Sequence, residues 1–101
     1  MFSVSARNEA LFQMEEEHRR IVRLLRNNRQ LLEGAELAIE VAKYNYRRNT
    51  NSQNKGQLLE VLEENCRQWL QHWTDRKDLL FLFCHIDDAL RQCRNSTETS
   101  S

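Results

Sequence analysis

The sequence predicts an all-α protein, built as a long antiparallel helical hairpin of the coiled-coil type. Three observations support this fold class: the 101 residues include no proline and only two glycines, apolar residues recur at alternating spacings of three and four, and one polar segment interrupts that recurrence near the middle. Proline and glycine are the residues that disfavour helix most, and a 3.5-residue period is typical of helices that pack along a seam. A chain this short forms a single domain with a small core.

The first predicted helix covers residues 6–48. We interpret residues 1–5 as its N-terminal cap, because the Ser5 hydroxyl can accept a hydrogen bond from a free amide of the first turn. Gly34 lies inside the apolar pattern without changing its phase, so we expect a flexible point there instead of a turn. Eleven consecutive seam positions keep the spacing, namely Leu11, Met14, His18, Ile21, Leu25, Asn28, Leu32, Ala35, Ile39, Ala42 and Tyr46.

Residues 49–56 are polar and are predicted to form the loop, and residues 57–94 are predicted to form the second helix. The apolar spacing of this second helix is interrupted by the polar residues 74–78. Laid antiparallel about the loop, the two helices bring His18 close to Asp87. The apolar positions assigned to the second seam are Leu59, Leu62, Cys66, Trp69 and Trp73 before the interruption, and Leu80 and Phe83 after it.

The interruption at 74–78 leaves two arrangements open. In the one that we favour, the second helix is continuous and the hairpin is simple. In the other, Thr74 or Asp75 caps a restarted helix, and the bend produces a three-helix bundle. The polar, aperiodic residues 95–101 are expected to be disordered.

The chain carries more apolar side chains than a hairpin seam can cover, which indicates that a further helix packs on it. A third helix of the same chain could do this after a bend, but we favour a bundle completed by another helical chain, either a different subunit or a second copy. Surface of this kind left in water would promote aggregation. The predicted partner contacts are Leu37, Val41, Tyr44, Leu79, Phe81, Leu82, Phe83 and Ile86.

The net charge is zero, because the chain has fifteen basic and fifteen acidic residues. The chain therefore has no net field that would concentrate nucleic acid or anionic lipid. Arginines nevertheless gather between residues 18 and 32, where no acid occurs. Arginine suits bidentate contacts with carboxylates and phosphates. We therefore expect an acidic protein partner first and nucleic acid second, on a stripe formed by Arg19, Arg20, Arg23 and Arg26.

No residue pattern indicates catalysis, a metal site, a cofactor or a small-molecule substrate. The three cysteines form no Cys-x-x-Cys pair, and no histidine lies three or four residues from a cysteine or from another histidine. We find no secretory signal and no apolar run of the roughly 18 residues that cross a membrane, so we expect an intracellular protein of the cytoplasm or nucleus. The sequence thus predicts a non-catalytic protein-interaction module, an adaptor or scaffold subunit.

Overall fold

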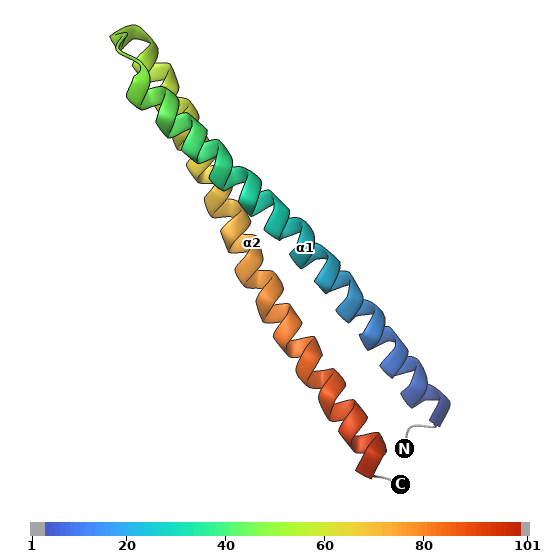
Figure 1. Cartoon of the computed structure of the whole chain (residues 1–101). Coiled ribbons are helices and arrows are strands. Elements are labelled where there is room, and N and C mark those ends of the chain that lie inside the picture. Colours follow the sequence, from blue (N-terminus) through green and yellow to red (C-terminus); the bar gives the residue numbers. More distant parts are fainter. Residues whose placement is uncertain (1–3, 100–101) are drawn as a thin grey trace. The chain divides into compact units, whose positions relative to one another are not determined.

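A computed structural model of the chain describes residues 4–99, which form two helices and no strand. The helices α1 (Val4–Arg48) and α2 (Ser52–Thr99) form a hairpin (Figure 1). The predicted all-helical hairpin is therefore confirmed. The chain comprises two compact units: unit 1 contains Met1–Arg26 and Lys77–Ser101, and unit 2 contains Asn27–Arg76.

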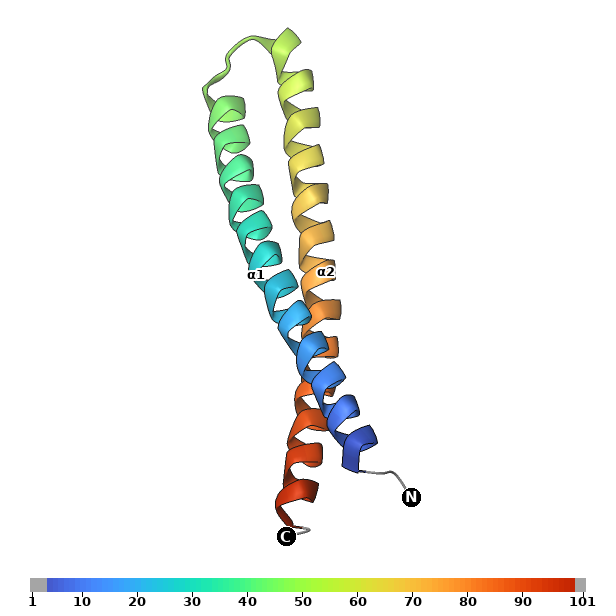
Figure 2. The ribbon, with the colours of Figure 1, turned by 90° about the vertical axis from the view of Figure 1, so that its right-hand side faces the viewer.

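The loop between the helices is shorter than predicted, because two asparagine side chains bind its backbone. Asn49 Oδ1 accepts a hydrogen bond from the Asn51 amide at 2.8 Å, and Asn51 Oδ1 accepts one from the Gln53 amide at 3.0 Å. The second contact is that of a helix N-cap. Residues 52–56, which were expected in the loop, therefore form the first turn of α2, and in unit 2 the two helices lie side by side beyond residues 49–51 (Figure 2).

The outer helix ends also differ from the prediction. Ser5 lies inside α1, which begins at Val4, so Ser5 is not the cap. α2 continues through residues 95–99, which were expected to be disordered, because neither proline nor glycine follows Arg94 to end the helix. Residues 1–3 of the expected cap and residues 100–101 of the expected tail lie outside the described part of the chain.

The seam of α1 follows the predicted spacing. All eleven predicted positions are buried or half-buried, and none is exposed. In unit 1 the most completely buried large side chain is Ile21, with 1% of its surface exposed. In unit 2 the buried positions are Asn28, Leu32 and Ala42. The apolar period of α1 was therefore sufficient to identify its packed side.

The seam of α2 lies one position away from the predicted one for much of its length. Polar residues occupy it at Asn65, His72 and Arg76, while Cys66 and Trp73 are exposed. Because Arg76 keeps the three-four spacing, the pattern is not interrupted, and α2 is assigned as one helix through residues 74–78. The seam positions are Leu58, Leu62, Asn65, Trp69, His72, Arg76, Leu79, Phe83, Ile86, Leu90 and Cys93, and Asp87 and Ala89 beside them are also half-buried.

Two hydrogen bonds in unit 2 partner the amide groups of two seam asparagines, whereas Arg76 Nη1 is buried without a hydrogen-bond partner among the described residues. Asn28 Nδ2 donates to the His72 carbonyl oxygen at 2.8 Å, and Asn65 Nδ2 donates to the Ala38 carbonyl oxygen at 3.4 Å. A buried amide that keeps a partner avoids most of its desolvation cost. Thr74 does not cap a restarted helix, since its hydroxyl donates to the Leu70 carbonyl oxygen within α2 at 3.0 Å.

Candidate functional site

In unit 2, residues 27–45 of α1 divide the circumference of the helix into three sides. One side is the seam against α2. A second side, the charged face, consists of Arg29, Glu33, Glu36, Glu40 and Lys43. The third side contains no charged residue and covers an arc of about 140° at 100° per residue. This third side, called the uncharged face, consists of Asn27, Gln30, Leu31, Gly34, Leu37, Ala38, Val41, Tyr44 and Asn45.

The uncharged face presents large apolar side chains to solvent. Leu31, Leu37 and Val41 are 53%, 67% and 51% exposed, and Tyr44 is exposed to a similar degree. Beside them, a shallow groove runs between Leu37, Ala38 and Val41 on α1 and Val61 on α2. Depletion of charge around exposed apolar and aromatic residues is the composition found at the centres of protein–protein interfaces.

The charged face differs in that its groups are already partnered. Arg29 Nε and Glu33 Oε1 are 3.3 Å apart, and Lys43 Nζ and Glu40 Oε1 are also 3.3 Å apart. Glu36 Oε1 accepts a hydrogen bond from Trp69 Nε1 at 3.4 Å. Exposed ion pairs of this kind contribute little to stability and keep a helix side in water. The charged face is therefore the solvent side of this segment.

Gly34 lies at the middle of the uncharged face, where no contact with α2 requires a glycine. A Cβ atom built on Gly34 would meet no atom within 4 Å. We expect Gly34→Ala to raise the free energy of unfolding of the monomer by about 0.5–1 kcal/mol, because alanine favours helix over glycine by that amount. Urea denaturation at low protein concentration measures the change, and an unchanged or lowered stability would contradict the open environment.

The structure divides the predicted partner contacts between exposed and packed positions. In unit 2, Leu37, Val41 and Tyr44 share the uncharged face. In unit 1, Phe81 and Leu82 are exposed. The remaining three, Leu79, Phe83 and Ile86, are half-buried along the seam of α2, where the Phe83 ring lies 5.1 Å from the His18 ring between centroids.

Sequence reasoning missed several exposed residues of unit 2. Gly34 and Val61 line the groove beside the uncharged face. A second exposed apolar stripe follows α2 and consists of Leu59, Cys66, Leu70 and Trp73. The clean separation of charged from uncharged positions on α1 was the signal that could have identified the uncharged face.

The predicted arginine stripe is half neutralised by neighbouring acids. Arg19 Nη2 lies 3.2 Å from Glu16 Oε1, and Arg20 is hydrogen-bonded to Glu17. The hydrogen bond from Arg20 lowers the pKa of the Glu17 carboxyl. Among the side chains that the structure describes, those of residues 5–95, no acid pairs with Arg23 or Arg26.

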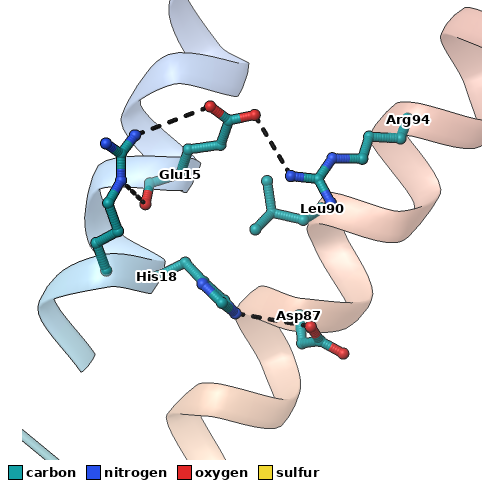
Figure 3. A pocket seen from close by; sticks show the side chains of 6 residues that line it. Glu15, His18, Asp87, Leu90 and Arg94 are labelled. Atoms are coloured by element: carbon teal, nitrogen blue, oxygen red, sulfur yellow. Dashed lines mark hydrogen bonds and ion pairs between the residues drawn. The ribbon is translucent and has the colours of Figure 1, made fainter. Parts of the chain in front are cut away.

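A polar cluster crosses the seam of unit 1 around the buried Leu90 (Figure 3). His18 Nε2 lies 3.7 Å from Asp87 Oδ1, and Glu15 Oε1 lies 3.5 Å from Arg94 Nη2. The predicted proximity of His18 and Asp87 is therefore confirmed. Opposite charges that meet across two helices fix their pairing. The cluster thus has a structural explanation within unit 1.

Among the described residues, no group of three or more histidine, cysteine, aspartate or glutamate side chains could hold a metal ion. Neither helix, over residues 4–99, contains a stretch long and apolar enough to cross a lipid bilayer. Comparison of the chain with protein families, with curated proteins and with solved structures gives no match.

Proposed function

We propose that this chain is a non-catalytic protein-interaction module, an adaptor or scaffold subunit that binds a helical partner through the uncharged face of α1. One observation carries the proposal: an arc of about 140° of an otherwise charge-rich helix has no charge and exposes four large apolar or aromatic side chains, Leu31, Leu37, Val41 and Tyr44. A helix partner fits this surface because the spacing of its ridges matches that of α1.

The energetic argument rests on surface that α2 leaves in water. Fully burying a leucine or valine side chain contributes about 1.5–3 kcal/mol. Leu31, Leu37 and Val41 are about half exposed or more, so each retains roughly half of that gain for a partner. Together with Tyr44, whose hydroxyl accepts a hydrogen bond from Arg48 Nη1, these side chains supply the apolar centre of an interface.

The proposal is tested with charge substitutions on the uncharged face. We expect Leu37→Glu and Val41→Glu to release the tagged chain from a larger complex in an extract of its source cells, because a buried carboxylate without a partner disfavours association. Size-exclusion chromatography of the extract measures the release. Circular dichroism of the purified variants should keep the parent helicity, since both side chains are exposed.

Arg29→Glu is the matched control, since it also adds negative charge to the same segment of α1, at a side chain that is 75% exposed on the charged face. The control chain should remain in the complex. Equal elution of the parent and both face variants would rule out this face as a docking site. Loss of helicity in Leu37→Glu would show that Leu37 belongs to the internal core.

A second candidate function is supported by Arg23 and Arg26, whose guanidinium groups have no acidic partner among the described side chains of residues 5–95. Exposed arginines without partners suit phosphate contacts. If the chain binds nucleic acid, the affinity should fall steeply with salt, and the double change Arg23→Gln with Arg26→Gln should reduce both the affinity and that salt dependence. Fluorescence anisotropy with a labelled duplex measures both quantities, and the uncharged-face variants should leave them unchanged.

A further inference from the structure

We infer that the partner of the uncharged face is a second copy of this chain, packed antiparallel so that Gly34 of one copy lies against Ala38 of the other. This inference rests on the proposed function and specifies its partner. In such a contact a two-fold axis passes between residues 34 and 38, and residue i meets residue 72 − i of the second copy. A two-fold interface requires the same surface patch to be complementary to itself.

The order of residues along the uncharged face meets that requirement. Reading along the part of the face that borders the seam, a polar residue is followed by a large apolar one, two small ones, another large apolar one and a second polar one. The spacings between them are four, three, four, three and four, which read the same in both directions. The residues in this order are Asn27, Leu31, Gly34, Ala38, Val41 and Asn45.

The antiparallel pairing matches large with large and polar with polar. Leu31 of one copy meets Val41 of the second, so two identical aliphatic contacts flank the axis. Asn27 meets Asn45 of the second copy at each end, where amide side chains can donate and accept hydrogen bonds. Between them, Gly34 and Ala38 allow the two helix backbones to approach closely, as small residues do at tight helix crossings. The space that surrounds Gly34 is open for this approach.

Charge also favours a second copy over a charged partner. An acidic or basic partner needs opposite charges on this face. All the charged residues between positions 27 and 45 lie on the charged face instead. Residues 27–45 of two copies brought together through their uncharged faces therefore bring none of their own charged side chains to the centre of the contact. The groove bordered by Val61 lies alongside and widens the surface available to the second copy.

The size of the contact predicts a reversible dimer. Residues 27–45 are about 28 Å long at 1.5 Å per residue. A single helix side of this length offers less than the roughly 800 Å² that each partner buries in a standard interface. We therefore expect a dissociation constant on the order of micromolar. Sedimentation equilibrium of the purified full chain should show a monomer–dimer equilibrium in this range, and a monomer up to about 1 mM would overturn the inference.

Disulfide cross-linking tests the antiparallel order in a chain whose native cysteines Cys66, Cys84 and Cys93 are replaced by serine. Leu31→Cys and Val41→Cys chains, when mixed and mildly oxidised, should form a mixed disulfide, because these two positions meet across the axis and a disulfide needs Cα atoms about 4.4–6.8 Å apart. Each variant alone should give at least tenfold less cross-linked dimer, since its own cysteines lie about 15 Å apart along the axis. Cross-linking of Leu31→Cys alone would indicate parallel helices and overturn the inference.

Gly34→Leu tests the close approach. It should keep the hairpin helicity, because a Cβ atom at Gly34 meets no atom within 4 Å in the monomer and leucine favours helix over glycine, while weakening the dimer at least tenfold. Glu40→Leu introduces the same residue on the charged face and should leave the dimer unchanged. If the purified chain is a monomer but Leu37→Glu still releases it from the cellular complex, a different helical partner occupies the face; the inference then fails and the proposed function stands.

Discussion

Replacing Ile21 with alanine should lower the free energy of unfolding by about 2–4 kcal/mol, the largest loss that we expect from a single truncation. Ile21 is 1% exposed and is the largest fully buried side chain among the described residues. Its removal takes apolar contacts from the seam of unit 1 and leaves a cavity that two regular helices cannot easily close. Because this seam is only one side chain deep, little other packing compensates. Urea denaturation followed by circular dichroism measures the loss.

Leu24→Ala is the matched control for this prediction. Leu24 lies three residues from Ile21 on α1 but is exposed, so its truncation should lower the free energy of unfolding by less than about 1 kcal/mol. Similar losses for the two variants would contradict the burial assigned to Ile21. Both variants should be measured at low protein concentration, where association does not contribute to the measured stability.

Replacing Asn28 with leucine should raise the free energy of unfolding by about 1–2 kcal/mol. Asn28 is 5% exposed, and its buried Oδ1 accepts no hydrogen bond from the described residues. Its Nδ2 donates to the His72 carbonyl oxygen, but that carbonyl lies inside α2 and keeps its helical hydrogen bond without Asn28. Leucine therefore removes an unsatisfied acceptor, adds apolar burial and leaves no new polar group without a partner.

Asn28→Ala distinguishes this explanation from a general tolerance of the site. Alanine also removes the amide, but it leaves a cavity, and it should give a stability below that of the leucine variant by about 1–3 kcal/mol. A leucine variant less stable than the parent would show that the hydrogen bond to His72 outweighs the desolvation of the amide. Buried asparagine in a helical seam commonly reduces stability while it fixes the register. Asn28→Leu is thus expected to form a more stable hairpin whose register is less tightly fixed.

The sequence was sufficient to predict the fold class and the packed side of α1. The apolar residues from Leu11 to Tyr46 keep one phase, and the seam of α1 has only two polar exceptions, so its period could be read directly. The seam of α2 could not be identified from its period. Polar residues occupy this seam at Asn65, His72 and Arg76, while apolar residues lie beside it at Cys66 and Trp73. A choice based on hydrophobicity alone was correct at Leu62, Trp69 and Phe83 and lay one position away at the other predicted seam residues.

The helix ends and part of the candidate site depended on contacts that a hydrophobic pattern does not reveal. Asn51 caps α2 through its side chain, and this converts polar residues of the expected loop into helix. Leu37, Val41 and Tyr44 were predicted as surplus apolar residues and are exposed. Leu79 and Ile86 were assigned to the same surplus alone but pack along the seam, whereas Phe83 was assigned to both. Assigning them required the phase of α2, which only the placement of the two helices provides.

The two tryptophans allow the units to be observed separately. Trp69 and Trp73 are the only tryptophans of the chain, both belong to unit 2, and their rings stack with centroids 6.2 Å apart. Tryptophan fluorescence therefore reports on unit 2, residues 27–76, and changes little when unit 1 unfolds. Circular dichroism detects the helices of both units. Coincident denaturation curves from the two signals would identify a single cooperative transition. A fluorescence change at a different denaturant concentration would show that one half of each helix can melt while the other half stays folded.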